Sequence, residues 1–89
     1  MKQYRIYTER KRVKDVCSIV SDHFGGFTVY EAIGYWRGTK EKSMVIEILS
    51  DFSTAEYHVI QLCKKIKGLN RQDAVMYTVQ DVKMTMWRA

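Results

Sequence analysis

The sequence predicts an α+β fold in which a four-stranded antiparallel sheet carries two helices on one face. Two segments, near residues 9–24 and 53–68, place apolar residues at helical spacing, and four other segments have strand-like composition. These segments follow one another in the order β-α-β-β-α-β. We expect one domain spanning residues 1–89, because no linker or internal repeat divides the chain.

The first strand and helix are predicted from residues 2–24. Lys2 to Thr8 alternates apolar and polar side chains, which is typical of a strand with one buried face. From Glu9 to about Phe24, apolar residues recur at the i, i+3, i+4 and i+7 spacing of an amphipathic helix. Gly25-Gly26 is expected to end that helix, because glycine readily adopts the positive φ of a helix terminus.

The second strand, from about Phe27 to Trp36, is apolar or aromatic on both faces. A strand exposed on one side normally alternates apolar with polar residues. Here Phe27, Val29, Ile33 and Tyr35 point one way, whereas Tyr30, Ala32 and Trp36 point the other. We expect residues 37–42 to form a polar connection to a third strand at Ser43–Leu49.

The second helix begins with a Ser53-Thr54-Ala55-Glu56 pattern that matches a capping box. Its inner face is expected to carry Ala55, Val59, Leu62, Cys63 and Ile66, and Gly68 is expected to end it. Residues 74–80 are predicted to form the fourth strand. Residues 81–89 are expected either to extend this strand or to add a short fifth one.

This order is the ferredoxin-like plan, with strands one and three in the middle of the sheet. The face opposite the helices should then expose a large apolar patch, or its alternate register: Tyr7, Tyr30, Ala32, Trp36, Val45, Leu49, Val75, Tyr77 and Val79. Monomers rarely tolerate such a patch. We therefore expect a homo-oligomer, held together by burial of this face.

Composition excludes several classes of protein. The longest apolar runs are about five residues against the roughly 20 that span a bilayer, and no signal peptide is apparent, so we expect a cytoplasmic protein without membrane contact. Cys17 and Cys63 are expected to be buried free thiols, and no metal site is expected at His23 or His58. The net charge of +5 arises within the first 14 residues, which suits a small anion better than nucleic acid.

The end of the second strand carries the first candidate binding residues. Tyr35 and Trp36 offer aromatic faces on which an adenine ring could stack, and Tyr30 is a third aromatic candidate. The alternative, favoured for all three and most of all for Tyr30, is that these rings fill a subunit interface.

Polar candidates open the third and fourth strands. A carboxylate at Glu41 or Asp73 could accept hydrogen bonds from a ribose diol or an α-amino group, with Ser43 and Gln72 as neighbours. The alternative is that both acids lie in solvated loops and pair with nearby lysines, which contributes little stability.

Basic candidates lie at the first strand-to-helix junction. Arg5 and Arg10, with Lys11 and Arg12, could grip a phosphate together with free backbone N–H groups at the helix start. Arg37, beside Trp36, is a second phosphate candidate. A charged surface turn is the alternative, and Arg5 is also a structural ion-pair partner for Glu47 or Glu31.

Several short motifs resemble those of small PII-like (nitrogen regulatory protein-like) proteins, a group that includes the phage S-adenosylmethionine lyases. They are Phe24-Gly25-Gly26-Phe27-Thr28-Val29-Tyr30, Gly34-Tyr35-Trp36-Arg37-Gly38, Glu41-Lys42-Ser43 and Asn70-Arg71-Gln72-Asp73-Ala74-Val75. The resemblance implies a trimer with inward-facing sheets and ligand sites in the clefts between subunits. It also implies an adenine nucleotide or an S-adenosylmethionine-like molecule as the ligand.

Two functional hypotheses follow. The first is a homo-oligomer, of a kind suited to a phage, that binds or sequesters an adenosine-containing metabolite in inter-subunit clefts without a cofactor. The alternative is an S-adenosylmethionine lyase that produces methylthioadenosine and homoserine lactone, so enzyme activity stays open. RNA binding on the sheet is disfavoured, because the central third strand has no aromatic residue between Val45 and Leu49.

Overall fold

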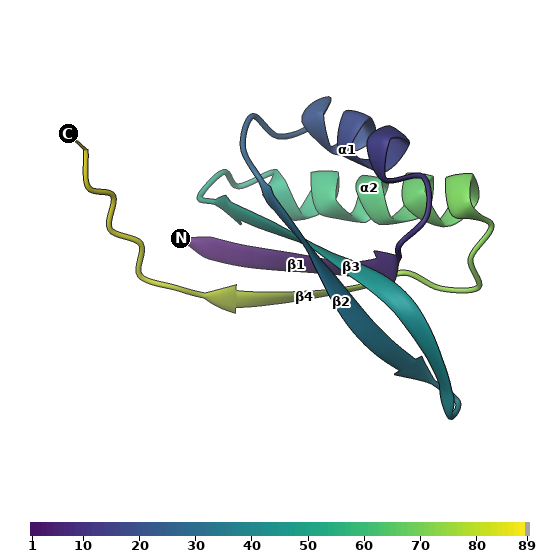
Figure 1. Ribbon diagram of the computed structural model, residues 1–89. Helices are drawn as coiled ribbons and strands as arrows, with labels where there is room; N and C mark the ends of the chain where they lie inside the picture. The colour runs from purple at the N-terminus through teal and green to yellow at the C-terminus, as the bar shows by residue number, and fades with distance from the viewer. Residues whose placement is uncertain (89) are drawn as a thin grey trace.

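The computed structural model describes residues 1–88 and has the predicted order of elements (Figure 1). The elements are β1 (Lys2–Glu9), α1 (Val13–Ser21), β2 (Thr28–Trp36), β3 (Thr39–Ser50), α2 (Ala55–Asn70) and β4 (Met76–Asp81). The strands form one antiparallel sheet in the order β2-β3-β1-β4. The ferredoxin-like prediction is confirmed, with β1 and β3 at the centre.

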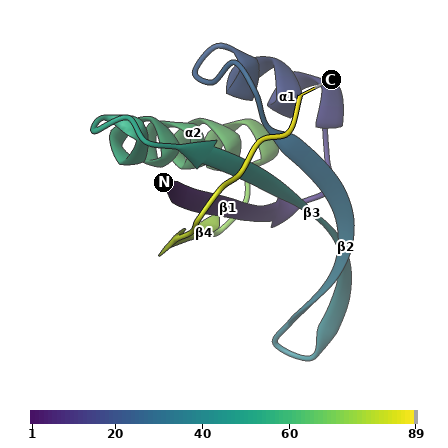
Figure 2. The same cartoon turned by 90° about the vertical axis from the view of Figure 1, so that its left-hand side faces the viewer.

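Both helices pack on the same face of the sheet, and the hydrophobic core lies between the two layers (Figure 2). The central strands contribute every second residue to this core, as a period of two requires. The fully buried large side chains are Ile6, Met44, Ile46 and Ile48 from the sheet and Val16, Val20, Val59, Leu62 and Ile66 from the helices. Burying each contributes roughly 1.5–3 kcal/mol, so this layer supplies the main stabilisation of the fold.

The opposite face of the sheet is not covered by any helix, and we call it the open face. Tyr7, Val45 and Tyr30 lie side by side across β1, β3 and β2 on this face. Together with Ala32, Trp36 and Leu49, they match the expected positions. The open face retains exposed large side chains, including Trp36 at 56% and Leu49 at 43% exposure.

In this part of the sheet the alternate register holds, so Val75, Tyr77 and Val79 lie on the helix side rather than on the open face. Tyr77 lies opposite Ile6, which is fully buried beneath the helices. The Tyr77 hydroxyl donates a hydrogen bond of 3.0 Å to Glu56 of α2. This contact ties the Tyr77 side of β4 to the helix layer, so Met76 lies on the open face instead.

Helix α1 is shorter than the sequence predicted, and glycine does not end it. It begins after Arg12, whose φ of 49° lies in the left-handed region, and it ends at Ser21. The backbone N–H groups of His23 and Phe24 both donate to the Val20 carbonyl, which closes the last turn. Gly25 and Gly26 have no positive φ, so the predicted role for these glycines was wrong.

Helix α2 also differs from prediction at both ends. The residue preceding the helix is Thr54, which makes no side-chain cap, and Glu56 instead accepts the hydrogen bond from Tyr77. The capping-box prediction was therefore wrong. The helix continues through Gly68 to Asn70, and Arg71 ends it with a φ of 52°.

Strands β2 and β3 meet in a two-residue turn, where a six-residue connection was predicted. Arg37 and Gly38 have φ values of 50° and 80°, the positive values of a tight type I′ hairpin. Pairing therefore continues through Trp36 and Thr39. Because β1 pairs with β3 only as far as Glu9 and Ser43, residues 33–42 project beyond the sheet as a two-stranded ribbon.

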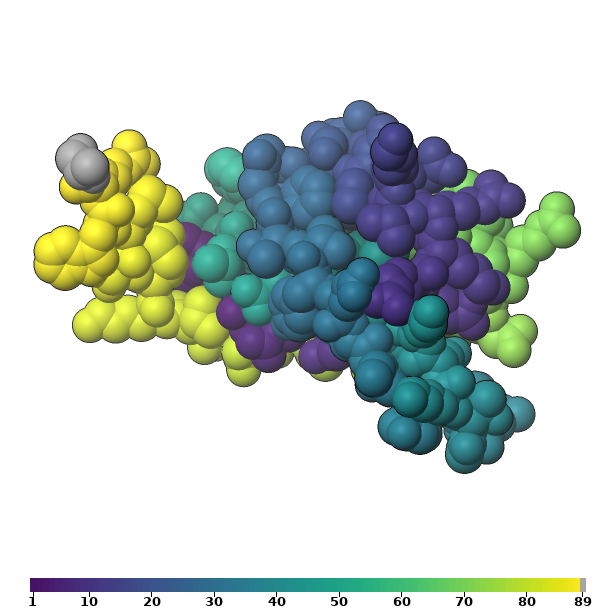
Figure 3. Space-filling model, viewed as in Figure 1, coloured from purple at the N-terminus to yellow at the C-terminus, as the bar shows by residue number. Residues whose placement is uncertain are grey.

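Residues 82–88 follow β4 as an extended segment outside the assigned strands, and we call this segment the arm. Within residues 1–88 it neither lengthens β4 nor forms a fifth strand; Ala89 lies outside the described residues. The Val82 N–H donates to the Met1 carbonyl at 3.0 Å. The arm, in yellow, and the ribbon, in teal, project from opposite ends of the molecule (Figures 1 and 3). No helix in this part of the chain is long and apolar enough to cross a membrane.

A histidine pair connects the two helices at the end of α1. The Nδ1 atoms of His23 and His58 lie 2.9 Å apart, and Lys65 Nζ lies 3.0 Å from His23 Nε2. Partial burial is the main cause that lowers the pKa of His23, and the charges of Lys65 and His58 lower it further. Asp22 opposes this shift. Neutral His23 therefore suits the folded state.

This arrangement predicts an acid-sensitive fold. The unfolded chain takes up a proton at His23 near its ordinary pKa of 6.5, whereas the folded chain does so only at lower pH. The contribution of this site to stability is thus present above pH 6.5 and is lost as the pH falls from there through the folded pKa. Thermal melts between pH 7.5 and 5 should show this loss, and His23→Gln should reduce it. Lys65→Met should reduce it partly, and an unchanged slope in both variants would contradict the assignment.

Candidate functional site

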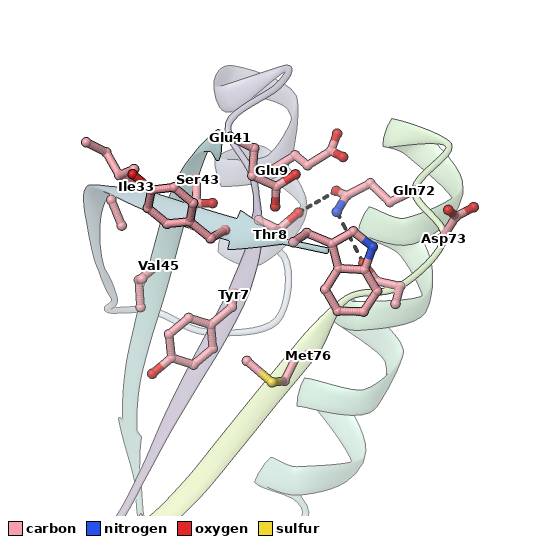
Figure 4. Close-up of a pocket in the computed structure, with 15 residues that line it drawn as sticks. Tyr7, Thr8, Glu9, Ile33, Glu41, Ser43, Val45, Gln72, Asp73 and Met76 are labelled. Carbon is pink, nitrogen blue, oxygen red and sulfur yellow. Dashed lines mark hydrogen bonds between the residues drawn. The ribbon is translucent and has the colours of Figure 1, made fainter. Parts of the chain in front are cut away.

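A cavity of about 360 Å³ lies where the ribbon leaves the sheet, beside the ends of β1 and the start of β4 (Figure 4). Its size falls within the usual range for small-molecule sites. Four segments line it: Tyr7, Thr8 and Glu9 of β1; residues 32–36 of β2; Glu41, Ser43 and Val45 of β3; and residues 72–74 with Met76 around the start of β4. The site therefore depends on the sheet topology, which brings these distant segments together.

Apolar and aromatic side chains form much of the cavity wall. Val45 is buried although it lies on the open face, and Tyr7 and Met76 lie on that same face. Trp36 and Tyr35, at the outer end of β2, are 56% and 71% exposed. The cavity thus combines a covered inner end with exposed aromatic rings at its outer end.

Gln72 is held in place by three hydrogen bonds. Its Oε1 accepts from Thr8 Oγ1 and, at 3.1 Å, from Asn70 Nδ2, while its Nε2 donates to the Ala74 carbonyl at 3.3 Å. Thr8 and Asn70 are themselves buried. The left-handed conformation of Arg71 ends α2 immediately before Gln72 and so directs the chain toward the cavity.

The cavity is acidic, although the chain as a whole carries a net charge of +5. Glu9, Glu41 and Asp73 line it, and no lysine or arginine is found among its lining residues. Glu9 Oε2 lies 2.7 Å from Lys11 Nζ but receives no well-directed hydrogen bond, so this pair is an ion contact only. The charge of the cavity suits a neutral or cationic group and opposes a polyphosphate.

Gly34 packs closely against Ser43 and Glu41 in the cavity wall. A Cβ atom at this position would lie 2.7 Å from Ser43 Oγ and 3.6 Å from Glu41 Cγ. Atoms of these kinds essentially never approach so closely, so the Ser43 hydroxyl would have to move. A side chain at position 34 would therefore displace the polar groups that face the cavity from β3.

The structure brings six of the ten sequence-predicted site residues together around this cavity. They are Tyr35, Trp36, Glu41, Ser43, Gln72 and Asp73. Tyr30 lies on the open face but outside the lining residues.

The three arginines of the predicted site also lie outside the cavity lining. Arg5 pairs with Glu47 at 3.0 Å, which is the structural alternative that the sequence left open. Arg10 pairs with Glu31 at 2.7 Å, a partner that the sequence analysis did not assign to it. Hydrogen bonding to Glu47 raises the pKa of Arg5. Arg37 places its guanidinium 5.5 Å from the centre of the Trp36 ring, a cation–π distance.

Sequence reasoning missed Tyr7, Thr8, Glu9, Gly34 and Met76 as site residues. The antiparallel register pairs Glu9 directly with Ser43, and Gly34 directly with Glu41. Once Ser43 and Glu41 were candidates, their cross-strand neighbours could have been found from the predicted topology. Met76 required the register of β4, which local patterning did not determine.

The two cysteine thiols lie outside the cavity lining and are poorly suited to nucleophilic chemistry. Cys17 and Cys63 are free and half-buried rather than fully buried. Burial raises the pKa of the Cys63 thiol to about 11, which disfavours the nucleophilic thiolate at neutral pH. Within residues 1–88, no cluster of three or more metal-ligating side chains is found.

These features define a ferredoxin-like α+β protein with a ligand-sized acidic cavity on the open face of its sheet. Neither a protein-family model nor a curated protein matches the sequence. Solved structures do share the fold. A DUF3240-family protein from Shewanella baltica OS155 is 11% identical, with a TM-score of 0.73, covering 99% of this chain and 97% of the other.

Two structures of phage SAM lyases are also similar. One, in the apo state, is 19% identical with a TM-score of 0.74, and covers 89% of this chain and 78% of the lyase. The other, in complex with S-methyl-5′-thioadenosine, is 20% identical with a TM-score of 0.70, and covers 90% and 80% of the two chains. At these identities the similarity establishes the fold alone.

The hydrogen bond from Thr8 to Gln72 gives a direct test of how the cavity is built. Thr8→Val keeps the shape of the buried side chain but removes the donor, and we expect the free energy of unfolding to fall by about 1 kcal/mol. Urea denaturation should measure this change. Thr78→Val, on the adjacent edge strand, serves as an exposed control and should change stability by less than about 0.5 kcal/mol. Equal stability of Thr8→Val and the parent chain would contradict a structural role for the bond.

Proposed function

We propose that this protein binds an adenosine-containing metabolite that carries no phosphate, in the acidic cavity beside the ribbon. The observation that carries this proposal is the lining itself: exposed aromatic rings, three carboxylates and no basic side chain. Binding or sequestration, rather than nucleic-acid recognition, is the activity that such a small, partly open site supports best.

The aromatic rings supply the apolar part of recognition. Trp36 and Tyr35 lie at the outer end of the cavity, where a planar base could stack on one of them. Base–aromatic stacking contributes about 1–3 kcal/mol per base in nucleic-acid sites. Arg37 over the Trp36 ring restrains that side chain before a ligand arrives.

The carboxylates supply the polar part. Ribose hydroxyls and amino groups are donors, and ionised Glu41 and Asp73 are acceptors only, so the two sets are complementary. Ser43 and Gln72 can each donate or accept and lie in the same lining. The three hydrogen bonds that orient Gln72 reduce the entropy lost when a ligand binds to it.

The charge of the site favours one of the two ligand classes that the sequence left open, which are adenine nucleotides and S-adenosylmethionine-like molecules. Adenine nucleotides carry phosphates, which would meet Glu9, Glu41 and Asp73 with no cation among the lining residues. Arg5 and Arg10 form ion pairs with Glu47 and Glu31 elsewhere. Arg37 lies against the Trp36 ring and outside the cavity lining. A neutral thionucleoside or a cationic sulfonium compound is therefore favoured over ATP.

We also propose that copies of this chain associate through the open face, as a trimer in the cytoplasm, with the cavity at the seam between neighbours. The exposure of Tyr30, Leu49 and Met76, at 41%, 43% and 58%, supports this arrangement. Apolar surface gains about 25 cal/mol for each Å² removed from water, so burying this face would favour assembly.

A second candidate function is cleavage of S-adenosylmethionine. It is supported by the similar phage SAM lyase that holds S-methyl-5′-thioadenosine and by the acidic lining, which suits a sulfonium. In this reaction the substrate carboxylate attacks its own Cγ, the Cγ–S bond breaks, and its electron pair passes to sulfur. The products are methylthioadenosine and homoserine lactone, and the protein need only hold the substrate in the folded conformation.

Calorimetry should separate the ligand classes. We expect methylthioadenosine and S-adenosylmethionine to bind and ATP to bind at least about 10-fold more weakly, which corresponds to about 1.4 kcal/mol. Trp36→Ala should weaken binding about 10-fold, and Gly34→Val should abolish it by displacing the Ser43 side chain in the cavity wall. Phe52→Ala removes an aromatic ring that is 74% exposed outside the cavity and should have no effect. Equal binding of ATP, or no binding of any compound at millimolar concentration, would refute the proposal.

Enzyme activity has its own test. Incubation of the protein with S-adenosylmethionine, followed by chromatography, should show methylthioadenosine and homoserine lactone in equal amounts if the chain is a lyase. Gly34→Val should yield neither product above the uncatalysed background. Binding without products over several hours would leave sequestration as the function and eliminate the lyase.

A further inference from the structure

The arm has the composition of a strand but has no strand beside it within residues 1–88. Val82, Met84 and Met86 alternate with Lys83 and Thr85, which is the period of two typical of a strand. Met86 is 61% exposed and Trp87 is 91% exposed. The arm therefore holds apolar side chains and backbone hydrogen-bonding groups in solvent, a combination that favours addition to another sheet edge.

The outer edge of β2 is a matching acceptor. β2 is an edge strand of the sheet, and its nine residues contain no lysine or proline, the residues that usually protect an exposed edge. In the ribbon, Ile33 is 63% exposed and Tyr35 is 71% exposed. A ribbon of two strands is only marginally stable in water, so a third strand along this edge would stabilise it.

The two features cannot meet within one chain. β4, from which the arm continues, and β2 are opposite edges of the sheet. The arm and the ribbon also project from opposite ends of a molecule whose longest Cα extent is 42 Å (Figure 3). A seven-residue extended segment spans about 23 Å, so the arm of one chain does not reach its own ribbon.

Charge also favours the pairing of arm with edge. Lys83 and Arg88 are the charged residues of the arm, and Glu31 is the charged residue of β2. Glu31 is 79% exposed in its side chain even though it pairs with Arg10. The arm is thus basic and apolar, whereas the edge that it would join is acidic and apolar.

We propose that the arm of one copy adds as a strand to the β2 edge of a second copy, in a head-to-tail contact. Such a contact joins two different surfaces, so repeating it closes a ring when the rotation between copies allows. Because residues 32–36 of β2 also line the cavity, the arm of the neighbour lies against the outer side of the cavity wall and completes it. This last consequence rests on the proposed ligand site, whereas the contact itself does not.

Complementation of two variants tests the contact without any ligand. The first variant stops after Asp81 and so lacks the arm but keeps the ribbon. The second, Ile33→Lys with Tyr35→Lys, keeps the arm but places charge on two exposed ribbon positions. We expect the open faces to meet only when the arm contact holds the copies together. In sedimentation experiments the intact chain should therefore form an assembly, whereas each variant alone should have the mass of a single copy, which is 10.5 kDa for the second variant and slightly less for the first. An equimolar mixture should give a 1:1 dimer, because one functional arm and one functional edge remain.

A second measurement does not depend on folding of the ribbon variant. A synthetic peptide of residues 82–89 should bind the variant that stops after Asp81, with a blue shift of Trp87 fluorescence, and should compete with assembly of the intact chain. Phe52→Ser alters an exposed aromatic residue outside both the arm and β2 and should assemble as the intact chain does.

Three results would overturn the contact: a monomeric intact chain, an unchanged assembly after the arm is removed, or no 1:1 complex and no peptide binding. The ligand-binding measurement is a separate test. Removing residues 82–89 should weaken methylthioadenosine binding about 10-fold, whereas failure of the intact chain to bind any ligand would refute the proposed function and leave the measured masses unaffected.

Discussion

The structure depends on one constraint: two short helices can cover only one face of a four-stranded sheet. Ile6, Ile46 and Ile48 of the central strands are fully buried beneath those helices, and this single layer forms the core. The alternate residues of the same strands then face away from the core with no covering element among residues 1–88. The open face is therefore the large sheet surface available to bind a ligand or to be buried against another molecule.

The cavity results from unequal strand lengths on the open face. β3 has 12 residues and β1 has eight, so the ribbon continues where the support from β1 ends at Glu9. Beyond Glu9 the ribbon has no neighbouring strand on the β1 side within residues 1–88. The connection from α2 to β4 fills part of this space with Gln72 and Asp73. A site formed in this way needs few dedicated residues, because the register of the sheet places carboxylates from β1, β3 and the α2–β4 connection around one space.

The sequence was sufficient to predict the features that depend on the spacing of apolar residues. It was insufficient where a long-range contact competes with a local conformational preference. The order of elements, the central strands and the grouping of Trp36, Glu41 and Ser43 at one end of the sheet follow from spacing and topology. The capping box failed because Glu56 binds Tyr77, a partner 21 residues away.

The errors at the helix ends and at the β2–β3 connection have a common origin in backbone conformations that the sequence pattern did not indicate. Arg12, Arg37 and Arg71 adopt positive φ, where glycine would be expected. Arg12 precedes α1 and Arg71 ends α2, whereas Gly25, Gly26 and Gly68 play no such part. The hairpin turn at Arg37 and Gly38 also lengthened β3, and this change converts an expected loop into the ribbon that borders the cavity.

The most direct test of the central claim is to map backbone amide shifts by nuclear magnetic resonance while methylthioadenosine is added. If the cavity is the binding site, the shifts should concentrate at residues 32–36, at Glu41 and Ser43, and at Gln72 and Asp73, with the Trp36 indole signal among the largest changes. Shifts confined to the helix layer, or none at saturating ligand, would contradict the account.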